Sequence, residues 1–365
     1  MRGIWHLSVP DSHVDNKCPC GLVQVVEPYQ AIPVRTTFHV ISPTAVLFIQ
    51  AVDAAMSLSG QFCQGESRVG EVDAFIIGVP KAGTTWLANV MSQNPGVTLS
   101  EPKEPNIVAT RQGTFGRDPT DPDWSRYEEC FSGDGLRVDA SIHTFACPLA
   151  PSRLSSRVPN APMILCLREP VSRAFSHWRM IIDTEEDARN GADWSDFYVA
   201  WGDDRLSGDS HYAISMKRWL EHFPLDQFLI IDSQRMRNDP GGVLGEVGGF
   251  LGLPDFEYDF DPSRHANSAT DRRPITNVGR AVRFLFSLIP SSIKKPIVST
   301  LQARDINIYA APVISRRAEK AAAGPEHYSI CADSLCSDLK DFESLTGFDT
   351  SHWVESIESN RQKSS

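Results

Sequence analysis

The chain has 365 residues, enough for one large α/β domain or two ordinary ones with a substantial buried core. Its formal net charge of -11 argues against nucleic acid as a bulk partner, and against a long polyanionic acceptor unless a local basic cleft binds it. Its 8 cysteines form neither a dense framework nor paired C-x-x-C spacings. We therefore expect free thiols, no structural metal, a reducing compartment and a cytoplasmic location.

The first part of the chain, residues 1–70, mixes Pro, Ser, Val and Thr without a clear period. We expect it to be a poorly ordered extension. Residues 38–58 are moderately apolar, but Pro43 and Asp53 interrupt them. A carboxylate at the centre of a membrane span costs about 2.5–3.5 kcal/mol on insertion scales. An extension is thus preferred to a membrane anchor, which 38–58 would form if it inserted.

The next stretch predicts a strand, a tight loop and a helix in succession. Phe75–Val79 is a short apolar run typical of a buried strand, and Pro80–Gly83 reads as a turn. A helix then begins at Thr84 or Thr85 and ends at 94–96, where Asn-Pro-Gly follows. Backbone N–H groups and the positive end of a helix dipole meet at such a loop, which therefore predicts an anion site.

The position of one lysine indicates which anion this loop binds. Gly78 and Gly83 have the spacing of a nucleotide phosphate loop, but Thr84 follows where an NTPase carries lysine. The lysine lies inside the loop instead, at Lys81, with the hydroxyls of Thr84 and Thr85 after it. We interpret the loop as a cradle for a single terminal phosphate. The alternative is a tight turn with a surface lysine.

The remaining elements alternate between strands and helices. The expected strands are 97–99, 136–139, 163–167 and 228–231; the expected helices begin at Pro170, cover 211–223 and 240–251, and close the chain around 335–345. Alternation of this kind predicts an α/β fold with a doubly wound, mainly parallel sheet, helices on both faces and a helical C-terminal closure. We expect a single domain over 71–356 and a polar tail over 357–365.

One late segment, 272–304, is strongly basic. It contains no acidic residue, and its charged residues are Arg272, Arg273, Arg280, Arg283, Lys294, Lys295 and Arg304. In so acidic a chain this is a local positive field, suited to nucleotide phosphate, an anionic acceptor or a lipid surface. The alternative is a solvated helix face.

A second motif, Leu167–Ser176, carries the other informative residues. Arg168 leaves a strand at its carboxyl end, where doubly wound sheets bind ligands, and Ser176 lies two turns into the following helix. A guanidinium and a hydroxyl so placed can share one phosphate. Phosphate sites on two crossovers imply a nucleotide phosphorylated at both ends. No aspartate follows a second apolar strand in the way that magnesium-dependent NTPases require, so magnesium is not implied.

The two motifs together resemble the sulfotransferases that use 3′-phosphoadenosine 5′-phosphosulfate (PAPS). The segment Pro80, Lys81, Ala82, Gly83, Thr84, Thr85, Trp86 and Leu87 resembles their 5′-phosphosulfate loop, and Leu167–Pro170 through Ser176 resembles their 3′-phosphate site. The resemblance, which runs from about Asp73 to Trp353, implies a P-loop-like fold, PAPS as sulfonate donor and 3′,5′-adenosine bisphosphate as product. It also implies that Arg168 and Ser176 bind the donor, with Arg272 and Arg273 closing over it.

The segment Ser100–Pro105 resembles the Lys-Glu-Pro segment of the heparan sulfate sulfotransferases and their bacterial relatives. This resemblance implies that Glu104 is the general base and that Lys81 stabilises the leaving bisphosphate. His143 is the second candidate for the base, and Lys103, Asp139 and His143 are expected on the acceptor side.

The acceptor itself stays open at this stage. Asn106–Val108 stands where aromatic residues usually follow Lys-Glu in the heparan sulfate branch. A hydroxyl or amine of a saccharide or glycoconjugate is expected, with a phenol or alcohol as the alternative. The other interpretations are a P-loop kinase or NTPase and a nucleotide-binding module without turnover. No partner nucleic acid is expected, and contact of 272–304 with a membrane remains an alternative.

Overall fold

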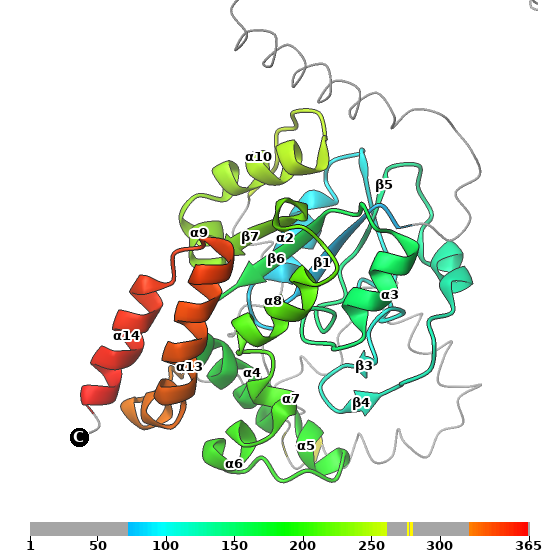
Figure 1. Ribbon diagram of the computed structural model, residues 1–365. Helices are drawn as coiled ribbons and strands as arrows, with labels where there is room; N and C mark the ends of the chain where they lie inside the picture. Colours follow the sequence, from blue (N-terminus) through cyan, green and yellow to red (C-terminus); the bar gives the residue numbers. More distant parts are fainter. Residues whose placement is uncertain (1–71, 261–275, 277, 280–320, 364–365) are drawn as a thin grey trace, which may run out of the picture. The chain divides into compact units, whose positions relative to one another are not determined.

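The centre of the fold is a parallel sheet built from the apolar runs of the sequence. The computed structural model describes residues 72–260, 276, 278–279 and 321–363. In it the strands follow the order β2-β5-β1-β6-β7 (Figure 1). They are β1 (Ala74–Gly78), β2 (Val97–Leu99), β5 (Leu136–Asp139), β6 (Met163–Leu167) and β7 (Phe228–Asp232). Every residue of β1 and β6 is buried, as expected of central parallel strands that are covered on both faces.

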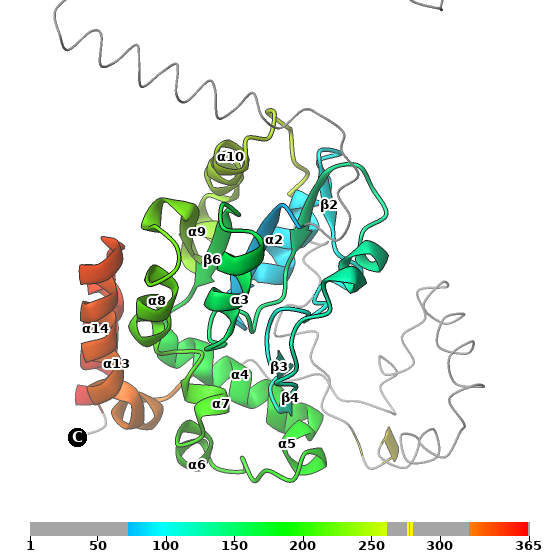
Figure 2. The ribbon, with the colours of Figure 1, turned by 45° about the vertical axis from the view of Figure 1, so that its right-hand side comes forward.

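The direction in which successive strands are added to the sheet reverses at β1. Through α2 (Thr84–Met91) the chain passes from β1 to one edge of the sheet, and through α3 (Ala150–Arg157) it passes from β5 across to β6. Because crossovers are right-handed, the two helices lie on opposite faces, as Figures 1 and 2 show. The prediction of a doubly wound sheet with helices on both faces is confirmed. Ligands bind such folds at the carboxyl ends of the strands beside the reversal, here β1 and β6.

The longer helices agree with the sequence patterns, with small shifts of their ends. They include α4 (Pro170–Thr184), α8 (Tyr212–Leu220) and α10 (Pro240–Leu251). Gly252, at φ 66°, ends α10, and the amide of Leu253 donates to the carbonyl of Gly248 at 2.8 Å. The helix expected over 211–223 is shorter than predicted and ends at Leu220.

Several short elements were not predicted. They are the hairpin β3 (Arg111–Gln112) and β4 (Gly116–Arg117), the 3-10 turn η3 (Leu225–Gln227), and the helices α3, α5 (Glu186–Arg189), α6 (Phe197–Trp201), α7 (Asp204–Ser207) and α9 (Ser233–Asn238). Each is too short to show a hydrophobic period. The spacing of Trp124, Tyr127 and Phe131 predicts a packed helix face, and the structure has the 3-10 turn η2 (Trp124–Cys130) there.

Two C-terminal helices, α13 (Pro325–Thr346) and α14 (Ser351–Gln362), form an antiparallel pair, in which α13 packs against α8 and α4 and α14 packs on α13 (Figure 1). The carboxylate of Asp338 in α13 accepts from the amides of Ala213 at 2.9 Å and Ile214 at 3.2 Å, and so caps the start of α8. The rings of Phe348 and Trp353 lie 5.6 Å apart and pack back on the closure. The predicted helical closure is confirmed.

The expected domain boundary at 356 is wrong. Helix α14 continues to Gln362, and Ile357 is completely buried in the hydrophobic core. The prediction failed because residues 357–365 are polar apart from Ile357, and one apolar residue is a weak signal. The extension expected over 1–70 lies outside the described residues.

Replacing Ile357 by alanine is expected to lower the free energy of unfolding by about 2–5 kcal/mol, because it leaves a cavity in the core. Denaturant unfolding of the full chain measures this. The matched control is Glu355→Ala on the exposed face of the same helix, which should change stability by less than about 0.5 kcal/mol. Equal stability of the two variants would mean that α14 does not belong to the cooperative unit.

Within the described ranges, no helix has the length and apolar character needed to cross a membrane. The segment 38–58 lies outside those ranges, as does 272–304 except for residues 276, 278 and 279. The cysteines that the structure describes, Cys130, Cys147, Cys166, Cys331 and Cys336, are free thiols, as predicted.

Candidate active site

The loop between β1 and α2 is a tight turn fixed to the neighbouring strand. The amide of Val79 donates to the carbonyl of Cys166 at 2.8 Å, and the amide of Ala82 donates back to the carbonyl of Val79 at 3.2 Å. Gly83 has φ 89°, and a Cβ there would lie 3.0 Å from the methyl of Met236 in α9. The positive φ favours glycine here, and the Met236 side chain would have to shift for any larger residue.

The start of α2 is open to an anion, whereas the start of α4 is not. Gly83 gives α2 no side-chain cap, and its first turn has no acidic residue. In α4, by contrast, the carboxylate of Glu169 accepts from the amides of Val171 at 2.9 Å and Ser172 at 2.8 Å. Uncapped N–H groups at a helix start bind phosphate well. A backbone cradle is therefore available at α2, and a second anion near α4 must rely on side chains.

The two predicted phosphate motifs meet in the structure. The Nη1 of Arg168 donates to the carbonyl of Lys81 at 3.3 Å. The Nζ of Lys81 lies 3.5 Å from the sulfur of Met180, which is one turn after Ser176 in α4. Residues 87 and 99 positions apart in the chain are thus brought together across the carboxyl ends of β1 and β6.

An arginine that the sequence did not single out, Arg237 of α9, strengthens the positive potential here. The pKa of the Arg168 guanidinium is lowered, first by burial and then by repulsion from Arg237. An anion between the two guanidinium groups would relieve that repulsion. Only the sheet order, which places β7 and α9 beside β6, could have identified Arg237.

The segment that carries Glu104 is held over the end of β5. Lys103 Nζ donates to the carbonyl of Ala140 at 3.3 Å, and the amide of Asn106 donates to Ser141 Oγ at 3.0 Å. Between these two anchors, Glu104 Oε1 accepts from Lys103 Nζ at 2.8 Å, and the Glu104 side chain is 30% exposed. An accessible carboxylate is thus fixed in direction by an ion pair.

Asp139, expected on the acceptor side, is turned into the protein instead. It is 2% exposed. One oxygen accepts from Tyr127 Oη at 2.5 Å and the other from the amide of Ser141 at 2.7 Å. Burial raises the pKa of this carboxyl group. Asp139 therefore supports the segment that follows β5, and both of its oxygens are already used for this.

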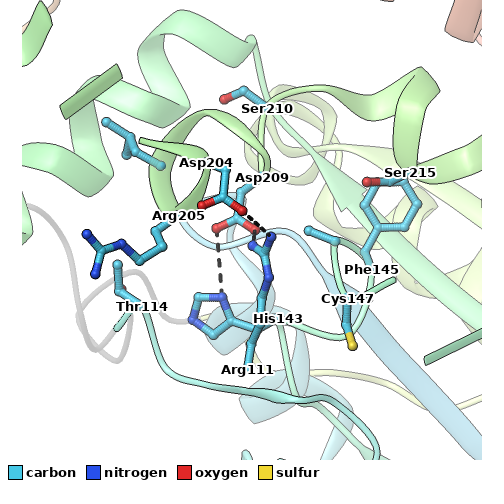
Figure 3. A network of polar contacts seen from close by, with 12 residues as sticks. Arg111, Thr114, His143, Phe145, Cys147, Asp204, Arg205, Asp209, Ser210 and Ser215 are labelled. Atoms are coloured by element: carbon cyan, nitrogen blue, oxygen red, sulfur yellow. Dashed lines mark hydrogen bonds and ion pairs between the residues drawn. The ribbon is translucent and has the colours of Figure 1, made fainter. Parts of the chain in front are cut away.

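His143 is also buried, at 5% exposure, and its Nδ1 faces Asp209 Oδ2 at 3.7 Å (Figure 3). Burial lowers the pKa of the imidazole, which favours its neutral form. The charge of Glu104 acts on this ring, and Ser141, which binds the amide of Asn106, lies two residues before His143. Its partner Asp209 follows α7 and gave no signal in the sequence.

The other predicted residues are placed as follows. Pro80, Ala82 and Thr84 are buried, Thr85, Trp86 and Ser176 are half-buried, and Gly83 is exposed. Arg272 and Arg273 lie outside the described residues. Within the described ranges, no group of three or more His, Cys, Asp or Glu side chains could hold a metal ion.

Comparison with known proteins identifies the family of the chain. The model of the sulfotransferase domain family matches residues 71–266. The chain is 26% identical over 204 residues to the bifunctional heparan sulfate N-deacetylase/N-sulfotransferase 1 of Caenorhabditis elegans, covering 53% of this chain and 24% of that protein. It is 27% identical over 209 residues to the human heparan sulfate glucosamine 3-O-sulfotransferase 3B1, covering 53% of this chain and 49% of that protein. The chain thus spans half the length of these relatives or less.

A solved structure shares the fold. The sulfotransferase from Alicyclobacillus acidocaldarius aligns with a TM-score of 0.52 at 19% identity, over 78% of this chain and 98% of that one. The family match covers more than half of the chain and includes both phosphate motifs and Glu104. The chain belongs to the sulfotransferase family, as the two motifs predicted.

Proposed function

We propose that the protein transfers a sulfonate group from PAPS to a hydroxyl or amine of a saccharide or glycoconjugate. The observation that carries this proposal is the contact between the two phosphate motifs, in which Arg168 donates to the carbonyl of Lys81. One nucleotide with phosphate groups at both its 3′ and 5′ positions can reach both motifs at once.

The donor is assigned to the two crossovers. The backbone of Pro80–Gly83 and the open start of α2 hold the 5′-phosphosulfate, with Lys81, Thr84 and Thr85 as further donors. Arg168 and Ser176 hold the 3′-phosphate, and Arg237 adds positive charge from α9. We also assign Trp86, Arg272 and Arg273 to donor binding, as the resemblance implies.

The reaction is a proton transfer coupled to an in-line displacement. Glu104 takes the proton of the acceptor O–H or N–H, and the acceptor atom forms its bond to sulfur. At the same time the bond between sulfur and the 5′-phosphate oxygen breaks, and 3′,5′-adenosine bisphosphate leaves with the electron pair. Lys81 meets the charge that develops on this oxygen. Lys103 holds the Glu104 carboxylate in direction through their 2.8 Å ion pair.

A saccharide acceptor is supported by the two named relatives, which are heparan sulfate sulfotransferases. Glu104 lies in the same kind of Lys-Glu-Pro segment that suggested this branch. A phenol or a simple alcohol is the competing acceptor class. Assaying glycans and phenols side by side distinguishes the two classes.

Transfer of labelled sulfonate from PAPS to a panel of glycans, lipids and phenols tests the proposal. We expect labelled product with at least one glycan, and far slower product formation by the Glu104→Gln variant. Transfer to phenols alone would exclude the saccharide assignment. Hydrolysis of ATP with magnesium, without any sulfonate transfer, would favour the kinase or NTPase interpretation.

Replacing Arg168 by alanine is expected to weaken binding of 3′,5′-adenosine bisphosphate by about 10- to 100-fold, because charge-assisted hydrogen bonds contribute about 1.5–3 kcal/mol. Adenosine 5′-phosphate lacks the 3′-phosphate and should bind nearly as well as to the parent. Calorimetric titration of both nucleotides measures the difference. The control is Arg235→Ala in α9, whose side chain pairs with Glu246 on the surface. Equal losses for the two nucleotides would contradict the role of Arg168.

A further inference from the structure

A buried network of charged side chains surrounds Asp209, which is 1% exposed. Asp209 Oδ1 accepts from Arg111 Nη1 at 3.1 Å, and Oδ2 lies 3.9 Å from Arg173 Nη1. Figure 3 shows the guanidinium of Arg111 and the ring of His143 both turned toward this carboxylate. Two buried guanidinium groups thus hold the carboxylate in place.

Two atoms of this network face each other without a hydrogen bond. Within the described part of the chain, His143 Nδ1 and Asp209 Oδ2 are buried and have no hydrogen-bond partner, although they are 3.7 Å apart. Burying such groups unsatisfied is costly. Hydrogen bonds at active sites are often long before substrate binds and shorten in the complex. The pair is therefore in position to close when an acceptor contacts His143.

A second histidine of the network, His177, also lies near Asp209, with its Nδ1 3.9 Å from Oδ2, but a closer donor decides its tautomer. Arg173 Nη1 lies 3.3 Å from His177 Nδ1, and a guanidinium can only donate, so this nitrogen accepts. The proton of a neutral His177 is then on Nε2, which lies 2.9 Å from Thr114 Oγ1. At His143 the neighbour of Nδ1 is a carboxylate, which can only accept. The proton of a neutral His143 is then on Nδ1, and Nε2 has a free lone pair.

We propose that Asp209 is a positioning residue that fixes this tautomer of His143, and that His143 Nε2 accepts a hydrogen bond from a second hydroxyl of the acceptor. This inference rests on the proposed sulfotransferase function. The reacting hydroxyl gives its proton to Glu104, and a hydroxyl on a neighbouring carbon donates to His143.

The arrangement of the loops supports two neighbouring contacts of this kind. Lys103 and Asn106 bind the backbone of Ala140 and the side chain of Ser141, so Glu104 is held over the segment that leads to His143. The charges of Glu104 and Asp209 both act on the His143 ring, together with those of Arg111 and Arg117. Since Nδ1 is directed to Asp209, Nε2 is the nitrogen that remains for substrate.

This geometry selects the chemical class of the acceptor. A saccharide presents hydroxyl groups on adjacent carbons and can satisfy Glu104 and His143 together. A phenol with one hydroxyl can satisfy only Glu104. A site that is built to bind a hydroxyl discriminates strongly against an analogue that lacks it, because the polar group of the site is left unpaired.

The substitution Asp209→Asn is the sharpest test of positioning. The new amide is expected to donate to His143 Nδ1, which moves the proton of the ring to Nε2 and turns an acceptor into a donor. We expect kcat/KM for methyl glucosaminide to fall by about 10- to 100-fold, as for the loss of one buried hydrogen bond. Asp204→Asn is the matched control, since Asp204 also lies near Arg111, at 3.9 Å, but its side chain is 84% exposed.

Nitrogen NMR of the imidazole rings gives a readout that needs no turnover. In the free parent protein we expect the His143 signals of a ring protonated on Nδ1, with the assignment taken from a His143→Gln variant. The Asp209→Asn variant should show protonation on Nε2. A parent ring protonated on Nε2 would overturn the inference, and this holds even if Asp209→Asn does not fold.

Monodeoxy analogues of methyl glucosaminide complete the test. The parent should lose activity with the analogue that lacks the neighbouring hydroxyl, and His143→Phe should accept that analogue and the full sugar equally. If the parent sulfates all analogues alike, or sulfates only 4-nitrophenol, the role of His143 is refuted while the sulfotransferase function stands. If nothing is sulfated, the proposed function fails, and the NMR result alone decides whether Asp209 positions His143.

Discussion

The substitution Glu104→Gln is expected to lower kcat for sulfonate transfer by about 10²- to 10⁴-fold, which is the usual contribution of a general base. Glutamine has nearly the same shape and keeps a hydrogen bond with Lys103, but it cannot take a proton. Affinity for 3′,5′-adenosine bisphosphate should not change, because Glu104 lies on the segment over β5 and not on the phosphate loop. Single-turnover transfer and nucleotide titration measure the two quantities separately.

The control for this variant is Glu101→Gln, an exposed carboxylate in the same segment. It should transfer sulfonate at the parental rate. If Glu104→Gln also transfers at that rate, the base is another group, and His143 becomes the leading candidate because its ring lies within the field of Glu104.

The substitution Lys81→Met is expected to weaken nucleotide binding and also to lower kcat by about 10²- to 10³-fold, as for the removal of one charge-stabilising donor. Methionine keeps most of the length of the side chain, so packing near Met180 is retained while the ammonium group is lost. The backbone at Lys81 has φ 72°, and methionine bears the same cost there as lysine. Stopped-flow transfer at saturating PAPS separates the two effects.

The control for Lys81→Met is Lys103→Met, which removes the ammonium group of a lysine on the acceptor side. It should leave the affinity for 3′,5′-adenosine bisphosphate intact. If Lys81→Met binds and reacts like the parent, the loop is only a structural turn, and the assignment of Lys81 is wrong.

The parts of the fold that could be predicted are those determined by residues close together in the sequence. The runs at β1 and β6 are buried on both faces and therefore continuously apolar, so they stand out without any knowledge of their neighbours. The loop Pro80–Gly83 combines glycine, proline and lysine in five consecutive positions with the start of α2. Both features need only a few adjacent residues to be recognised.

The parts that could not be predicted depend on contacts between distant residues. Arg111 and Asp209 are 98 positions apart and form a buried ion pair, which no pattern of nearby residues indicates. Arg237 joins Arg168 only because β7 lies beside β6. Asp139 was misplaced because a carboxylate at the end of a strand can point to the crevice or into the core, and its bond to Tyr127 decides between them.

The cap that Asp338 places on α8 links the C-terminal helices to the donor side. Tyr212, the first residue of α8, donates through its hydroxyl to the carbonyl of Arg168 at 2.6 Å. The family match ends at residue 266, well before α13 begins. The matched stretch is therefore shorter than the unit that folds. A fragment that ends at residue 266 would lack Asp338, which caps α8, and α8 would hold Tyr212 against Arg168 less firmly. Grafting this domain onto another protein requires carrying the chain through α14.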